Sequence, residues 1–175
     1  MRHHLSEHPD KRLSSIAQDD FCFNPSRDQI GHTPPSNTIV DVLDSAMECA
    51  ENFHAEASWN IEVHSRILSL ALRPSGQPQF ANLINFTSCS TASIIGDYLP
   101  CDFGAKKVDF CMYLNPIYDE PILPAYPTSL AHSKMEHAIG TVKDYLPESV
   151  INYTDYPALR ERPIILNIET KRRFG

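Results

Sequence analysis

The chain has 175 residues, of which 42% are hydrophobic and 21% are charged, and this composition is typical of one globular domain. Its formal net charge of −7 disfavours a tight, non-specific nucleic-acid binder, which would carry a basic face, but not an enzyme that meets nucleic acid at one site. The five cysteines form no C-x-x-C pair and no apolar run reaches transmembrane length, so we expect an intracellular protein, in the cytoplasm or nucleus, with reduced thiols and no membrane span.

The first part of the chain predicts a polar arm followed by two helices. Residues 1–35 are polar and predict a flexible N-terminal arm, so that the domain itself covers 36–175. Ser36 or Asn37 can cap the first helix, which carries apolar residues at helical spacing. A second helix is predicted over 55–72, before a Pro-Ser-Gly turn.

The second predicted helix carries an acid within its apolar stripe. On a helical wheel Glu56 falls between Trp59 and Ile67, whereas Glu62 falls on the polar side. A glutamate on a buried face costs free energy unless it is paired, so Glu56 is a candidate site residue. The alternative is that Glu56 stands at the helix start, where the helix dipole favours an acid. His64 flanks the stripe, where a hydrogen-bonded packing role is favoured over metal ligation.

Three strands are predicted after the helices, over residues 80–87, 106–114 and 163–171. A long, proline-punctuated segment over residues 115–162 separates the last two strands and is interpreted as an insertion or cap. The order of helix, helix, strand, strand, insertion and strand predicts an α+β fold, with helices followed by an antiparallel three-stranded meander.

The predicted strands carry three charged side chains among apolar neighbours. Asp109 lies in the second strand, and Glu169 and Lys171 end the third. Because side chains alternate along a strand, Glu169 and Lys171 point the same way, and we expect all three on one face. Two acids and a lysine suit a magnesium-dependent phosphodiester hydrolase, since carboxylates bind the hard cation and lysine orients or activates the attacking water. The alternative is solvated charges at strand ends, because an acid-x-Lys triplet also arises by chance.

With these residues assembled, the chain resembles the PD-(D/E)XK nuclease superfamily, and more closely its fungal group of PD-(D/E)XK nuclease-like domain proteins. The resemblance runs from about residue 37 to the end, and its carriers are Glu56–His64, Lys107–Phe110 and Pro163–Lys171. It implies a restriction-endonuclease-like core, α-β-β-β-α-β, of which this chain is expected to lack the last helix and strand.

The resemblance also implies a site and an activity. A divalent cation, Mg²⁺ or Mn²⁺, would be held by the side chains of Asp109 and Glu169 and by the backbone carbonyl of Thr170. Lys171 would orient or activate water, and Glu56 would touch the metal or its water shell. The expected reaction is hydrolysis of phosphodiester bonds in nucleic acid.

A rival interpretation is a non-nucleolytic protein on the same scaffold, either an enzyme of a fungal small-molecule pathway or a catalytically idle interaction domain. The net acidity favours this rival, whereas the intact acid and lysine set favours the nuclease. The uncovered edge of a three-stranded sheet also predicts self-association as a homodimer. A small-molecule substrate predicts an apolar pocket lined by Tyr113, Tyr118 and Tyr126; nucleic acid predicts a basic groove past Lys106, Lys107, Lys171 and Arg172.

Overall fold

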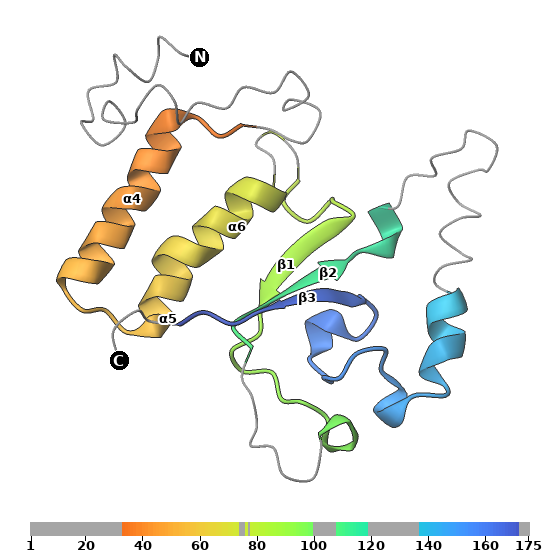
Figure 1. Cartoon of the computed structure of the whole chain (residues 1–175). Helices are drawn as coiled ribbons and strands as arrows, with labels where there is room; N and C mark the ends of the chain where they lie inside the picture. Colours follow the sequence, from red (N-terminus) through yellow and green to blue (C-terminus); the bar gives the residue numbers. More distant parts are fainter. Residues whose placement is uncertain (1–32, 74–75, 77, 100–107, 119–136, 172–175) are drawn as a thin grey trace, which may run out of the picture. The chain divides into compact units, whose positions relative to one another are not determined.

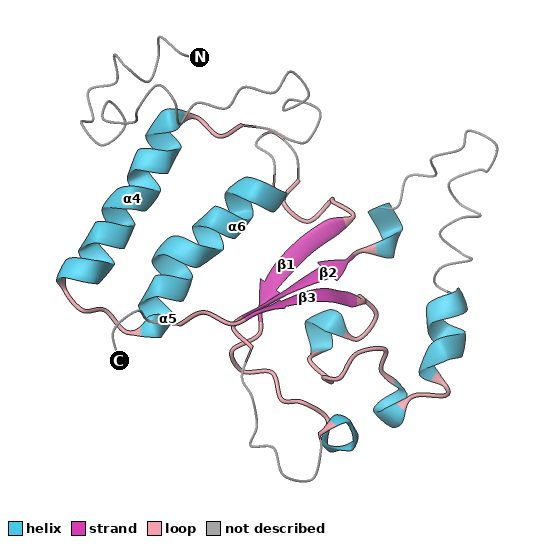
Figure 2. Ribbon diagram, viewed as in Figure 1, coloured by secondary structure: helices cyan, strands magenta, loops and turns pink. Residues whose placement is uncertain are grey.

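The computed structural model of the chain describes residues 33–73, 76, 78–99, 108–118 and 137–171 (Figure 1). Almost all of the predicted arm, the middle of the predicted cap, and Lys106, Lys107, Tyr126 and Arg172 lie outside these residues. The chain divides into two compact units, Met1–Ala71 and Leu72–Gly175. The described part of the first unit is helical, and the second contains the sheet (Figure 2).

Two helical segments form the first unit. The first is α4 (Ser36–Glu51), and the second is a continuous run of α5 (Glu56–Trp59), the π-helical turn η2 (Asn60–His64) and α6 (Ser65–Leu72). Both predicted helices are therefore confirmed. The predicted cap of the first was wrong, because α4 already begins at Ser36 and its N-cap position is Pro35, which has no capping side chain. No helix in the described ranges is both long and apolar enough to cross a bilayer.

The π-helical turn changes which residues face the core of this unit. Val42, Cys49 and Val63 are buried there. A π turn closes i→i+5 hydrogen bonds and is wider than an α turn, so residues beyond it are out of phase with a uniform wheel. Ile67, predicted in the apolar stripe, is 49% exposed for this reason. The partly buried residues around the core are Ala46, Trp59 and Leu70.

The second unit contains an antiparallel sheet in the order β1–β2–β3 (Figure 1). Its strands are β1 (Ile84–Ser88), β2 (Phe110–Leu114) and β3 (Ile164–Ile168). Helices combined with a three-stranded antiparallel sheet confirm the predicted fold class. Each strand is shorter than its sequence pattern predicted, so Asp109 precedes β2 and Glu169 follows β3.

The central strand β2 buries side chains on both faces of the sheet. On one face Cys111 and Tyr113 join Cys89 and Leu159 in a buried cluster. On the other face Phe110 meets Phe86 of β1 edge to face, with ring centroids 6.2 Å apart. Because successive side chains of a strand point to opposite faces, the continuous apolar run of β2 contributes to the core on both faces of the sheet.

A buried amide connects the segment after α6 to β1. Asn85 is fully buried, and its Oδ1 accepts hydrogen bonds from Arg73 Nε and from the Phe86 peptide N–H, both at 2.9 Å. Its Nδ2 donates to the Gln79 carbonyl at 2.9 Å. The Arg73 guanidinium also lies 4.0 Å from the centroid of the Phe86 ring. The buried polar group is thus hydrogen-bonded on both sides, as a stable core requires.

The described end of the cap segment packs against the sheet. Leu159, in the 3₁₀ turn η6 (Pro157–Leu159), is fully buried in the cluster with Cys111 and Tyr113. The side chain of Asn152 donates to the carbonyls of Leu159 and Arg162 and accepts from the Ile164 N–H. This one side chain therefore holds the turn beside the first residue of β3. The other described helical pieces of the cap are η4 (Pro116–Tyr118), residues 137–143 and η5 (Pro147–Ser149).

We expect Leu159→Ala to lower the free energy of unfolding by about 2–5 kcal/mol, because it removes a fully buried side chain from the sheet core. Urea denaturation at neutral pH measures the change. Val142, which is 50% exposed and lies outside the sheet, is the control, and Val142→Ala should cost less than about 1 kcal/mol. Equal losses in the two variants would contradict the assigned core.

Candidate functional site

The candidate site lies at the end of the sheet where β2 begins and β3 ends. Because the two strands are antiparallel, Asp109 comes beside the residues that follow β3. The peptide N–H of Asp109 donates to the Ile168 carbonyl at 3.0 Å, and the Asp109 carbonyl accepts from the Cys89 N–H at 2.8 Å. Asp109 thus joins the ends of β1 and β3 to the start of β2.

Asp109 stands outside the regular ladder of β2. In a regular antiparallel strand the N–H and C=O of one residue bond the same neighbouring strand, whereas those of Asp109 bond different neighbours. The backbone therefore turns at this residue, as it does at a β-bulge, and strand alternation does not set its side-chain direction. The predicted regular strand was therefore wrong at residues 108 and 109, while residues 106 and 107 lie outside the described part of the chain.

The carboxylate of Asp109 is hydrogen-bonded to Thr170. Asp109 Oδ2 accepts from the Thr170 N–H at 2.7 Å and from the Thr170 hydroxyl at 2.9 Å. Hydrogen bonds to a charged acceptor are stronger than neutral ones, and Asp109 is half-buried, where solvent weakens them less. They hold the segment after β3 beside the start of β2.

Glu169 and Lys171 form an exposed ion pair beside Thr170. Lys171 Nζ lies 3.7 Å from Glu169 Oε1, so the two side chains point the same way, as predicted. Their side chains are 58% and 77% exposed, for Glu169 and Lys171 respectively. An exposed ion pair contributes little to stability, so a bound ligand could reorganise it at small cost.

The predicted cation would find two carboxylates at this end of the sheet. Magnesium is commonly held by one or two carboxylates, with water and phosphate oxygens completing its shell, so Asp109 and Glu169 fit its donor chemistry. Within the described residues, no three His, Cys, Asp or Glu side chains form a group that could hold a metal. A cation would have to bind Asp109 through Oδ1 or displace Thr170 from Oδ2. That the two carboxylates share one cation stays a prediction.

Glu56 belongs to the helical unit, and of its two interpretations the structure supports the helix start over the buried face. It is exposed and is the first residue of α5, where the helix dipole favours an acid without any need for a buried partner. Glu62 is exposed, as predicted. His64 Nδ1 bonds Asn60 Oδ1 at 3.0 Å, in agreement with the predicted packing role. A contact between Glu56 and the metal site stays a prediction.

The structure also brings together a polar group that sequence reasoning missed. Cys111 Sγ lies 3.7 Å from the Tyr153 hydroxyl and 3.6 Å from Asn167 Oδ1, and Cys89 is in the same buried cluster. These residues come from segments far apart in the chain, so no short motif marks them. The signal that the sequence did offer was strand alternation, which predicts that Cys111 and Tyr113 point to the same face of the sheet.

Comparison with known proteins gives a family match that spans most of the chain. The family model of the PD-(D/E)XK nuclease superfamily matches residues 6–175, which include all the candidate site residues. No curated protein and no solved structure matches the chain. The narrower resemblance to the fungal group stays a prediction.

We expect Thr170→Val to lower the free energy of unfolding by about 1–2 kcal/mol, because it removes one hydrogen bond to a half-buried carboxylate while keeping the side-chain shape. Thermal or urea unfolding measures the loss. Thr141→Val is the matched control, since Thr141 is exposed and, within the described residues, its hydroxyl bonds the His137 carbonyl of its own helix. A Thr170 loss no larger than that of the control would mean that this contact does not hold the site.

Proposed function

Because the chain belongs to the PD-(D/E)XK nuclease superfamily, we propose that it is a metal-dependent nuclease domain that hydrolyses phosphodiester bonds in nucleic acid. The observation that supports this most is the set of hydrogen bonds by which Asp109 connects the ends of β1 and β3 to the start of β2. Its carboxylate bonds Thr170, and Glu169 and Lys171 are the sequence neighbours of Thr170. Fold alone does not determine a reaction, so the proposal rests on these side chains.

Each charged residue has a distinct role in this proposal. Asp109 and Glu169 would hold Mg²⁺ or Mn²⁺, which when bound supplies positive charge against the phosphate and activates water. Lys171, as the ammonium that pairs with Glu169, would orient the attacking water. The exposed ammonium would also attract the phosphate before reaction. The Thr170 hydroxyl and N–H hold Asp109 in place.

The net charge of −7 argues for weak, local contact with nucleic acid rather than for a long electrostatic groove. The proposed substrate is therefore bound mainly at the site itself. An intracellular location, expected from the cysteine pattern, is part of the same proposal. Binding should weaken only slightly with added salt, because few phosphates are contacted.

We expect the full chain to cleave labelled DNA or RNA with Mg²⁺ or Mn²⁺, and Glu169→Gln or Lys171→Ala to reduce the rate at least about 100-fold. The matched controls are Glu161→Gln and Lys143→Ala, because Lys143 and Glu161 form a comparable ion pair at 3.1 Å in the cap. Gel-resolved cleavage rates measure the difference. Retained cleavage in the Glu169 and Lys171 variants would show that a contaminating nuclease or another site acts.

The same assay separates Glu56 from Glu62, which both belong to the helical unit. Glu56→Gln should slow cleavage, whereas Glu62→Gln should leave it unchanged, since both are exposed and differ only in predicted role. Titration of Mn²⁺ binding by calorimetry gives a readout independent of turnover. Loss of Mn²⁺ binding in Asp109→Asn but not in Glu56→Gln would place Glu56 outside the metal's ligands.

One observation favours the non-nucleolytic alternative. A cavity of about 460 Å³ opens beside the described part of the cap, and this volume suits a small-molecule ligand. Of the three predicted lining tyrosines, Tyr113 is buried in the core, Tyr118 is absent from the described lining of this cavity, and Tyr126 lies outside the described residues. Its described lining residues are Asn115, Pro116, Ile117, Ile139, Gly140, Lys143, Glu161 and Arg162. This mixed lining favours a polar small molecule over an apolar one.

We further propose that the chain self-associates through β3, which is an outer strand of the described sheet. Ile165 and Leu166 on it are 45% and 52% exposed, and a two-fold copy of an antiparallel edge complements itself. Light scattering at micromolar concentration should give twice the chain mass, and Leu166→Lys should shift it to a monomer. Ile61→Lys, at a 66% exposed position of the helical unit, is the control. A strictly monomeric native chain would refute this proposal.

A further inference from the structure

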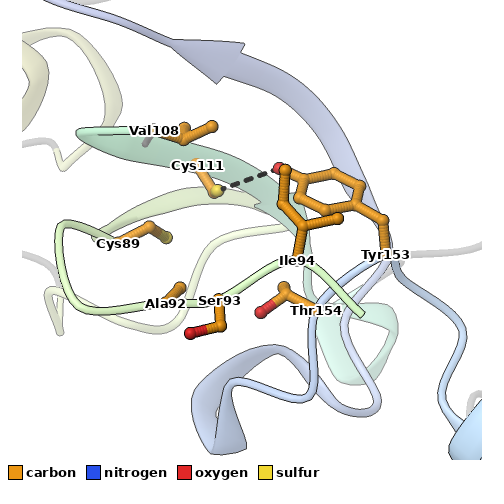
Figure 3. A pocket seen from close by; sticks show the side chains of 8 residues that line it. All are labelled: Cys89, Ala92, Ser93, Ile94, Val108, Cys111, Tyr153 and Thr154. Atoms are coloured by element: carbon orange, nitrogen blue, oxygen red, sulfur yellow. Dashed lines mark hydrogen bonds between the residues drawn. The ribbon is translucent and has the colours of Figure 1, made fainter. Parts of the chain in front are cut away.

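Two cavities of the sheet unit differ greatly in volume. The one that Cys89 and Cys111 help to line (Figure 3) has about 10 Å³, which is room for about one water molecule. The other, which we call the cap cavity, has about 460 Å³ and is lined by residues of the segments 115–117, 139–143 and 161–162. Ligand pockets commonly have about 300–1,000 Å³, so of these two cavities the cap cavity is the one that can admit an organic molecule.

A buried amide in the lining of the cap cavity lacks a described partner. Asn115 is 4% exposed, its peptide N–H donates to the Leu83 carbonyl at 2.7 Å, and its carbonyl accepts from the Tyr118 N–H at 3.0 Å. Its side-chain amide forms no hydrogen bond with the residues that the structure describes. The buried side chains of Asn85 and Asn152, in contrast, are bonded through both oxygen and nitrogen. Because a buried amide without a partner costs free energy, a ligand that bonds Asn115 gains affinity.

The described lining also carries one positive charge in excess. Lys143 Nζ lies 3.1 Å from Glu161 Oε1, so these two charges balance each other. Arg162 is half-buried, and its described side-chain contacts are with a neutral group. Its Nη1 donates to the Tyr113 hydroxyl at 3.5 Å, and the guanidinium lies 5.2 Å from the centroid of that ring. A guanidinium has five N–H donors in a planar fork that matches the oxygens of a carboxylate or phosphate, so Arg162 suits an anionic group in the cavity.

The rest of the described lining is apolar or open. Pro116, Ile117 and Ile139 provide apolar surface. Gly140 leaves free space, because a Cβ added there would meet no atom within 4 Å. Burial of apolar surface favours binding, so these residues suit an apolar part of the ligand. The lining therefore fits a molecule that combines one anionic group with an apolar body.

We propose that the cap cavity binds a small organic anion, which is a carboxylate or a phosphate monoester with an apolar body. The oxyanion binds the guanidinium of Arg162, and the amide of Asn115 donates to an oxygen of the ligand. The apolar body packs on Ile117 and Ile139. Such a ligand is the small molecule of the non-nucleolytic alternative, but its binding does not require nuclease activity, since no described lining residue belongs to the acid site.

The test titrates four probes against the folded full chain without divalent cations, with binding followed by NMR of the probe. The probes are benzoate, phenyl phosphate, neutral benzamide and inorganic phosphate. We expect benzoate or phenyl phosphate to bind at least about tenfold more tightly than benzamide, which has the same ring without the charge. The tighter of the two anions distinguishes a carboxylate from a phosphate ligand. No binding of either organic anion, or equally tight binding of inorganic phosphate, would overturn the proposal.

Gly140→Leu tests the location without replacing a buried residue. Gly140 is exposed within the helical residues 137–143, and a side chain there meets open space, so the variant should fold and fill part of the cavity. We expect it to weaken binding of the anionic probe at least about tenfold. Gly96→Leu is the matched control, because a Cβ at Gly96 also meets nothing within 4 Å and Gly96 is outside the described lining. Equal affinities in the two variants would overturn the assignment to the cap cavity.

Two variants of Arg162 test the ionic contact. Arg162→Gln should lower the affinity for benzoate or phenyl phosphate to that for benzamide, because the charge is lost. Arg162→Lys keeps the charge but not the fork, so it should give an intermediate affinity. Circular dichroism verifies that each variant is folded, and Gly140→Leu decides the location without them. Unchanged affinity for the anionic probe in folded Arg162→Gln would overturn the proposal.

Discussion

The hydrogen bonds of Asp109 are the constraint on which the rest of the sheet unit depends. Its peptide N–H bonds β3, its carbonyl bonds the residue after β1, and its carboxylate bonds Thr170. In a regular antiparallel strand the N–H and C=O of one residue bond the same neighbouring strand. Those of Asp109 bond different segments, so the backbone departs from the regular hydrogen-bond ladder at this residue. Irregular backbone at a strand end is a frequent way to aim a polar side chain at a functional site.

The core explains why this departure from the regular ladder is tolerated. β2 buries Phe110 on one face and Cys111 and Tyr113 on the other, so its position is set by packing on both sides. Leu159 from the cap completes the second face, and Asn152 holds that turn next to β3. Because the middle of the sheet is fixed by these contacts, its end can carry charged side chains without loss of register.

The buried thiols of Cys89 and Cys111 and the acid site are connected through the backbone of Asp109. Cys89 donates its N–H to the Asp109 carbonyl, and its side chain lies beside Cys111. The acids at this end are exposed or half-buried, whereas the thiols are buried under the cap. The polar end of the sheet and its buried core therefore depend on the same few backbone hydrogen bonds.

The sequence by itself determined the helices, the three strands and the acid and lysine candidates, because helical spacing and strand alternation are local properties that survive folding. It misjudged Ile67, because a π turn changes the phase of a helix without any mark in the pattern of residues. It left the burial of Glu56 open between the apolar stripe and the helix start, and the structure shows Glu56 exposed as the first residue of α5. Tertiary structure alone decided the turn at Asp109, the bonds to Thr170 and the meeting of Cys89 with Cys111. Each of these depends on hydrogen bonds or packing between strands distant in sequence, and no local pattern encodes such contacts.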